Sequence, residues 1–154
     1  SDKGFSVIIA LKYENSLEEQ SYFYSIFGDS VDYQYASRSD FSTYRAIDRS
    51  RLSLSGYSTC CGEALGVGRR ALFVNSTGFV GSRVSEAGIS YLEDSRYREF
   101  SDRIESILEM TEKEYTKVMS QSAKYMMNYD LEEMPHQKIR SVVLDVINNN
   151  SESY

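Results

Sequence analysis

The chain has 154 residues, of which 41% are hydrophobic and 26% are charged, and its formal net charge is -6 at pH 7. This length predicts about one domain with a buried core, and the composition excludes a disordered chain. The acidic balance argues against a general nucleic-acid binder, which would show a basic face. No apolar run approaches the roughly 20 residues that a membrane-spanning helix needs.

The first predicted element is a strand at 5–11, where the run FSVIIAL is rich in β-branched residues. A continuous apolar run of this kind predicts a strand that is buried on both faces. Lys12 follows it directly. Ser16 and Glu19 then have the spacing of a capping box, so the next element is predicted to be a helix. Its apolar stripe consists of Leu17, Phe23, Ile26 and Phe27 and ends at Gly28.

A second strand is predicted at 31–35, where VDYQY alternates polar and apolar residues and indicates a half-exposed face. Phe41, Tyr44 and Ile47 are then spaced as one side of a short helix, with Asp40 as its cap. Arg38 stands between these two elements. Like Lys12, it follows the carboxyl end of a predicted strand.

The stretch LSLSGYSTCCGEALGVGRRALFVN at 52–75 has the order strand, loop, helix, strand. Two strands joined by one short helix should be parallel, because the crossover returns to the same sheet. The loop then lies at the carboxyl end of its strand, where open α/β sheets bind ligands. Ser58 and Thr59 are placed to cap the helix, whose first N–H groups would face an anion. Glu63 lies about one turn further, on the side that can face the same crevice.

The repeated alternation of strand and helix up to Val74 predicts an α/β fold with one Rossmann-like parallel sheet and helices on both faces. A polar loop at 76–88 and a last short strand at 88–92 follow. We expect a single domain over 1–147 and a polar tail at 148–154.

Three helices are predicted to close the chain. The first has the stripe Tyr97, Phe100, Ile104, Ile107 and Leu108. The second opens with a capping box of Thr111 and Glu114. The third starts at Pro135, with Ile139, Val142, Val143 and Val146 facing inward.

The two cysteines, Cys60 and Cys61, are adjacent in a predicted helix and so cannot form an ordinary disulfide with each other. This usage predicts a reducing, cytoplasmic setting. Both are interpreted as small residues that pack against the sheet.

The segment STCCGEALGVGRRALFVN, followed by GISYLEDSRYREFSDRIESILEMTEKEY and KYMMNYD, resembles the C-terminal half of GT-B glycosyltransferases that build surface polysaccharide and lipopolysaccharide. A Ser-Thr turn before Glu-Ala, a strand ending in Asn, and the helical run after it carry the resemblance, from Phe41 to Asp130. It implies a domain that binds a nucleotide-sugar donor. The turn at Ser58 and Thr59 would hold the phosphates and Glu63 the ribose hydroxyls.

The resemblance also implies a glycosyl transfer without a metal or another cofactor, and no Asp-x-Asp motif is present in the sequence. A basic side chain would neutralise the departing nucleotide, with Lys12 and Arg38 preferred over Arg45. The general base would come from an N-terminal acceptor domain, which we expect elsewhere in the parent protein. This chain would then bind the donor without turning it over, and any membrane attachment would depend on other parts of that protein.

Other interpretations stay open. A GT-B-like enzyme could move a different group, as a glycerophosphotransferase or a sugar-nucleotide epimerase does, and a non-catalytic interaction module could keep the fold alone. Ser58 and Thr59 could serve only as a helix cap. Glu63 could be a solvated helix residue, and Lys12 and Arg38 could be surface charges.

Overall fold

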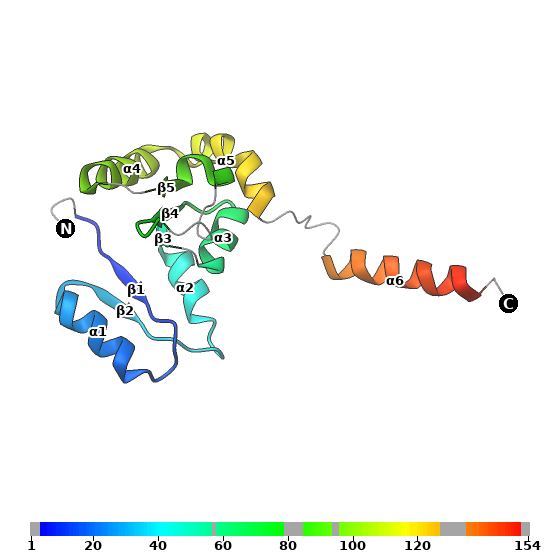
Figure 1. The fold of residues 1–154 in the computed structure, drawn as a ribbon, viewed down its shortest axis with the longest axis horizontal. Coiled ribbons are helices and arrows are strands. Elements are labelled where there is room, and N and C mark those ends of the chain that lie inside the picture. The colour runs from blue at the N-terminus through cyan, green and yellow to red at the C-terminus, as the bar shows by residue number, and fades with distance from the viewer. Residues whose placement is uncertain (1–3, 57, 79–84, 94–95, 127–134, 152–154) are drawn as a thin grey trace.

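The computed structural model describes residues 4–56, 58–78, 85–93, 96–126 and 135–151. Strands and helices alternate through the first half of the chain, and the last three helices follow the last strand (Figure 1). All of the described strand pairs are parallel. The α/β class predicted from the sequence is therefore confirmed.

The N-terminal unit consists of β1 (Ile8–Ala10), α1 (Leu17–Phe27) and β2 (Asp32–Gln34). The two strands pair in parallel, with Ile9 opposite Tyr33. Ser16 begins α1 as predicted, since its hydroxyl accepts a hydrogen bond from the Glu19 amide at 3.2 Å. After the helix, Gly28 has a φ of 51°, in the left-handed region that favours glycine.

The burial predicted for this unit is wrong. β1 has three residues instead of seven, and Ile8 and Ile9 are only half-buried. No residue of α1 is buried, and Leu17, the first residue of the predicted apolar stripe, is 76% exposed. A two-stranded sheet offers a helix too narrow a surface to cover its apolar stripe.

The second sheet consists of β3 (Ser53–Ser55), β4 (Ala71–Asn75) and β5 (Tyr91–Glu93), with β4 in the centre. α3 (Thr59–Gly66) connects β3 to β4. The predicted order of 52–75 and its parallel strands are confirmed, although Tyr57 of the predicted turn lies outside the described residues. β5 begins three residues later than predicted, because 85–90 form the 3₁₀ helix η3 (Ser85–Ser90). Residues 79–84 of the predicted loop also lie outside the described part of the chain.

The single sheet predicted from the sequence is wrong, because the described strands form two separate sheets. α2 (Ser42–Arg49) contacts β1, β2 and α3, and it lies between the two sheets in Figure 1. Alternation along the sequence predicts which elements follow one another. It does not determine whether strands that follow one another in the sequence pair within the same sheet.

The start of α2 also differs from the prediction. The N-cap residue is Phe41, not Asp40, and Phe41 has the left-handed backbone angles φ 50° and ψ 44°. For a bulky residue this conformation costs on the order of 1 kcal/mol. The buried residues of α2 are Ser42 and Ala46, whereas Phe41 and Tyr44 are 68% and 45% exposed. Of the three residues predicted to share one side of this helix, Phe41 and Tyr44 are thus exposed and Ile47 is half-buried.

The core is built around β4. Leu72 and Phe73 pack with Leu65 of α3, Ile107 of α4 (Tyr97–Glu109) and Tyr115 of α5 (Glu112–Met126). The Tyr115 hydroxyl accepts a hydrogen bond from the Ala71 amide at 3.1 Å and bonds the Ser90 hydroxyl at 2.9 Å. The hydroxyl of this buried tyrosine is thereby hydrogen-bonded, as buried polar groups generally are.

The two helices that cover this core largely match their predictions. Ile107 is fully buried, but Tyr97 at the start of α4 is 83% exposed and lies outside the stripe assigned to it. The capping box before α5 is confirmed. The Thr111 amide donates to Glu114 Oε2 at 2.8 Å, and the Glu114 amide donates to Thr111 Oγ1 at 3.3 Å. The hydrogen bonds that the Thr111 amide and hydroxyl donate to this carboxylate hold the pKa of Glu114 below its usual value.

The last helix, α6 (Pro135–Ser151), begins at Pro135 as predicted and includes 148–151 of the predicted tail. Its predicted inward residues, Ile139, Val142, Val143 and Val146, are all exposed, so that prediction is wrong. In Figure 1 α6 extends away from both sheets. Among the described residues, no helix combines the length and apolar character needed to cross a membrane.

Candidate functional site

The segments that follow β1 and β2 meet beside the start of α3. Residues 12–14, 36–38 and 41–44, together with Cys60, line a cavity of about 480 Å³. We call it the Arg38 cavity. It lies beyond the carboxyl ends of β1 and β2, which is where parallel sheets commonly place ligands.

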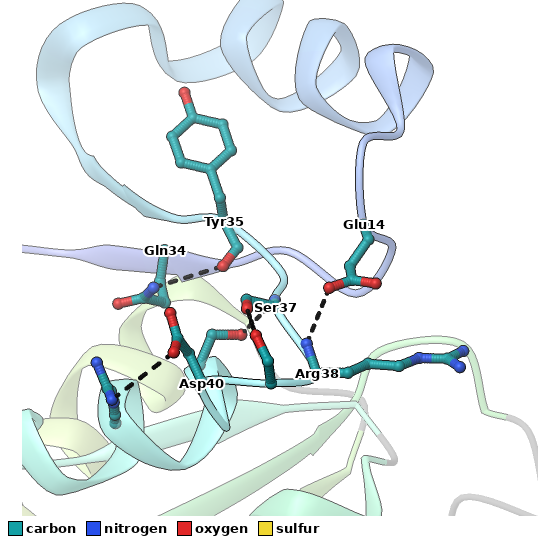
Figure 2. Close-up of polar contacts among 9 residues, drawn as sticks. Glu14, Gln34, Tyr35, Ser37, Arg38 and Asp40 are labelled. Carbon is teal, nitrogen blue, oxygen red and sulfur yellow. Dashed lines mark hydrogen bonds and ion pairs between the residues drawn. The ribbon is translucent and has the colours of Figure 1, made fainter.

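The two preferred cations of the sequence prediction, Lys12 and Arg38, both line the Arg38 cavity. The Arg38 amide donates a hydrogen bond to Glu14 Oε1 at 2.9 Å, and this bond ties the segment after β2 to the loop after β1 (Figure 2). The Arg38 guanidinium points away from the Glu14 carboxylate (Figure 2). Lys12 Nζ lies 4.8 Å from the centre of the Tyr13 ring. The cavity is therefore lined by two basic residues and one acidic residue, Glu14.

Glu19 holds the loop that carries Lys12. Its carboxylate accepts hydrogen bonds from the Lys12 amide at 3.0 Å and from the Tyr13 amide at 3.0 Å. The predicted capping box assigned this carboxylate to the Ser16 amide. Of the two hydrogen bonds of the predicted box, only the one from the Glu19 amide to the Ser16 hydroxyl is formed. The Glu19 carboxylate instead binds the backbone of the cavity wall at Lys12 and Tyr13.

Ser58 and Thr59 lie at the exposed N-terminus of α3, next to the cavity lining and not within it. Ser58 is the N-cap residue, but its hydroxyl makes no capping hydrogen bond. The predicted side-chain cap is thus wrong, whereas the predicted position is right. The first amides of a helix have no earlier carbonyl to bind, and they give this end a partial positive charge. Cys60, the second residue of α3, lines the cavity itself.

Glu63 is joined to the cavity through Tyr44. The Tyr44 hydroxyl donates a hydrogen bond of 2.5 Å to Glu63 Oε2, and Tyr44 is a lining residue. This hydrogen bond, with a smaller contribution from burial, raises the pKa of Tyr44 to about 12, so the phenol stays protonated and keeps donating at neutral pH. Glu63 is half-buried and lies one turn into α3, as predicted.

Arg45, the third candidate cation, opens onto a different cavity. This second cavity, of about 570 Å³, meets the Arg38 cavity at Ala36, Ser37 and Ser42. Arg45 forms an ion pair with Asp40 at 4.0 Å. The Ser37 amide donates to Ser42 Oγ at 2.9 Å and so fixes the wall between the two cavities. Arg45 is therefore separated from Lys12 and Arg38, and its charge is partly compensated.

The two cysteines have different surroundings, although both are free. Cys61 packs in the core as predicted, and burial raises the pKa of its thiol to about 11. Cys60 is half-buried on the cavity wall, which departs from the packing role assigned to it. Within the described ranges, no cluster of three or more His, Cys, Asp or Glu residues is placed to hold a metal ion.

Sequence reasoning missed four lining side chains that shape the cavity. Tyr13 and Glu14 had a signal, since they follow Lys12 beyond the same predicted strand end. Phe41 and Tyr44 were assigned to one side of a short helix, and nothing in that pattern indicated that they would line a cavity. No family model, curated protein or solved structure matches the chain. The assignment of the site therefore depends on its residues: two cations, a helix N-terminus, and a carboxylate held by a tyrosine.

Proposed function

We propose that this chain binds the nucleotide-sugar donor of a glycosyltransferase, with the nucleotide in and beside the Arg38 cavity. The observation that carries the proposal is the contact between Tyr44 and Glu63. It joins the carboxylate predicted to bind ribose to the cavity that holds both predicted cations. The fold class supports the proposal, because parallel α/β proteins commonly bind nucleotides beyond their strand ends.

Lys12, Arg38 and the N-terminus of α3 supply the positive charge that would bind the diphosphate of the donor. Phosphate oxygens would bind the first amides of α3, where the helix dipole is positive, and Lys12 and Arg38 of the cavity lining would add two cations. Charge-assisted hydrogen bonds of this kind are about twice as strong as neutral ones. Ser58 and Thr59 are exposed at that helix end, so their hydroxyls are available to the same phosphates.

Glu63 would bind the ribose. Its Oε2 accepts the Tyr44 hydroxyl, and an ionised carboxylate has further acceptor sites on both oxygens. Two neighbouring ribose hydroxyls can therefore donate to it. Tyr44 restricts the carboxylate to one position, and this lowers the entropy that binding would otherwise cost.

The reaction itself needs a second component. In the proposed transfer, the bond from the anomeric carbon of the sugar to the phosphate oxygen breaks, and an acceptor oxygen bonds to that carbon. The negative charge that develops on the phosphate would be stabilised by the α3 N-terminus, Lys12 and Arg38. The acceptor proton would pass to a base supplied by another domain. The chain alone is therefore expected to bind nucleotides without transferring sugar.

Calorimetric titration of the chain with UDP, GDP and CMP tests this proposal. We expect one of them to bind. Glu63→Gln should weaken binding about tenfold or more, since a charged hydrogen-bond acceptor contributes about 1.5–3 kcal/mol. Glu109→Gln is the matched control, because Glu109 is an exposed glutamate in the last turn of α4 and does not line the cavity. Absence of heat with all three nucleotides, or equal affinity in the two variants, would contradict the proposal.

A further inference from the structure

Three aromatic side chains stand exposed on the wall of the Arg38 cavity. They are Tyr13, Phe41 and Tyr44, and all three are at least 45% exposed. Aromatic rings carry much of the apolar area that proteins bury in their cores and interfaces. Several solvent-exposed rings at one cavity therefore indicate a binding surface for a flat apolar group.

Phe41 is the most exposed of the three, and its position is specific. It lies in the left-handed region with φ 50°, and this backbone conformation is sparsely populated by bulky residues. Its carbonyl accepts the Arg45 amide at 3.1 Å, so the first turn of α2 anchors it. Its ring centre lies 6.5 Å from that of Tyr44, with the two planes inclined by 57°. The phenyl ring is thus held beside Tyr44 and open to solvent.

Tyr44 connects this aromatic surface to the nucleotide proposed above. Its hydroxyl contacts Glu63, where the ribose would bind, and its ring neighbours Phe41. A base attached to that ribose would then lie against the rings, while the phosphates lie toward Lys12, Arg38 and the start of α3. We infer that Phe41, with Tyr44 beside it, is the stacking surface for the nucleobase. This inference rests on the proposed function and adds the base subsite to it.

The charge distribution favours a base over the donor sugar at this position. The two cations and the helix N-terminus would hold the phosphates, and the sugar is attached beyond them, on the side remote from the base. Stacking on an aromatic ring tolerates every base, because every base has a π-face. Phe41 therefore contributes affinity without selecting the base.

A matched pair of ligands isolates the base. UMP, GMP and CMP each differ from ribose 5-phosphate by the base, and all four ligands are titrated calorimetrically into the unchanged chain and into the Phe41→Ala variant. We expect the substitution to weaken the nucleotide that binds by about tenfold, the usual scale for one stacked base, and to leave ribose 5-phosphate unchanged. Phe41→Leu should give an intermediate loss, since it keeps the apolar bulk without the π-face. Tyr97→Ala, an exposed aromatic residue on α4, should change neither ligand.

Two results would overturn the base assignment while the proposed function stands. One is a nucleotide that binds Phe41→Ala as tightly as the unchanged chain. The other is a loss confined to UDP-glucose or GDP-mannose with unchanged affinity for UDP and GDP, which would place the sugar on the ring. If no nucleotide binds the unchanged chain, the proposed function fails and this inference fails with it.

Discussion

The N-terminal unit and the unit around β4 are both built from parallel strands and helices, but they bury their residues very differently. In β4 four of five residues are buried, and the side chains of α3, α4 and α5 pack on them. In α1 no residue is buried, and in β1 none is either. A central strand has a neighbour on each edge, whereas β1 and β2 have only each other. We conclude that the unit around β4 supplies most of the stability, whereas most of the cavity wall comes from the segments that follow β1 and β2 and from the start of α2.

The same sequence signature has different consequences in the two units. Thr111 and Glu114 form a closed capping box, so Glu114 stabilises its own helix. Ser16 and Glu19 have the same spacing, but the Glu19 carboxylate instead binds the amides of Lys12 and Tyr13. A glutamate in the first helical turn thus contributes to folding in one unit and to the geometry of the candidate site in the other.

The largest expected difference between the units is in the unfolding free energy lost when one leucine in each is replaced by alanine. Leu72→Ala removes a fully buried side chain from β4 and should lower the free energy of unfolding by about 2–5 kcal/mol. Leu17→Ala, in the exposed stripe of α1, should change it by less than about 0.5 kcal/mol. Urea denaturation followed by circular dichroism measures both. Equal losses would show that α1 is packed as tightly as β4.

Two tyrosine hydroxyls give the next largest contrast. Tyr115→Phe leaves the Ala71 amide and the Ser90 hydroxyl without their buried partner, and it should cost about 1–3 kcal/mol of unfolding free energy. Tyr33→Phe removes hydrogen bonds to the carbonyls of Gly28 and Phe23, and these bonds are only part-buried, so that water can replace them. It should leave the denaturation midpoint unchanged within error. A larger effect at Tyr33 would place part of the stabilising core in the N-terminal unit.

Substitutions of Glu19 and Glu114 sharpen the comparison further, because the first should affect nucleotide affinity and the second should affect stability. Glu19→Ala frees the loop that carries Lys12 and should weaken nucleotide binding by about threefold, the scale of one net hydrogen bond. Glu114→Ala should lower the denaturation midpoint slightly and leave nucleotide affinity unchanged. If Glu114→Ala also weakened binding, the division of roles between the units would be wrong.

The smallest expected effect is a pH dependence at Glu114. Its pKa in the folded chain lies below the ordinary value of 4.5, because the Thr111 amide and hydroxyl donate to the ionised carboxylate. The carboxylate therefore stabilises the fold above about pH 4.5, and this contribution is lost as the pH falls through the lowered pKa. The stability difference between the unchanged chain and Glu114→Gln should shrink between pH 5 and pH 3. A difference that grew on acidification would have the wrong sign.

Local patterns predicted local structure well. The helix before Gly28, the strand, loop, helix and strand of 52–75, and the capping box at Thr111 are all present, because each depends on residues close together in sequence. Burial at long range was predicted less well. The apolar stripes of α1 and α6 indicated helices correctly but did not reveal that neither stripe is covered in the described part of the chain.

The candidate site was predicted in outline. Lys12 and Arg38 share a cavity because both follow strand ends that parallel pairing brings together. The link from Glu63 to Tyr44 could not be predicted, since it joins residues 19 positions apart through the placement of α2 against α3. The left-handed turn at Phe41, where α2 begins, could not be predicted either, because a bulky aromatic residue gives no signal for it.

Alkylation of Cys60 tests the location of the proposed nucleotide most directly. Cys60 lines the cavity, whereas Cys61 is buried and has a raised pKa, so iodoacetamide should modify Cys60 alone in the folded chain. The nucleotide that binds in calorimetry is added at ten times its Kd, and alkylation of the Cys60 peptide is followed by mass spectrometry. We predict a rate about tenfold slower, in proportion to the fraction of free protein. An unchanged rate with nucleotide bound would place the nucleotide elsewhere and contradict the account.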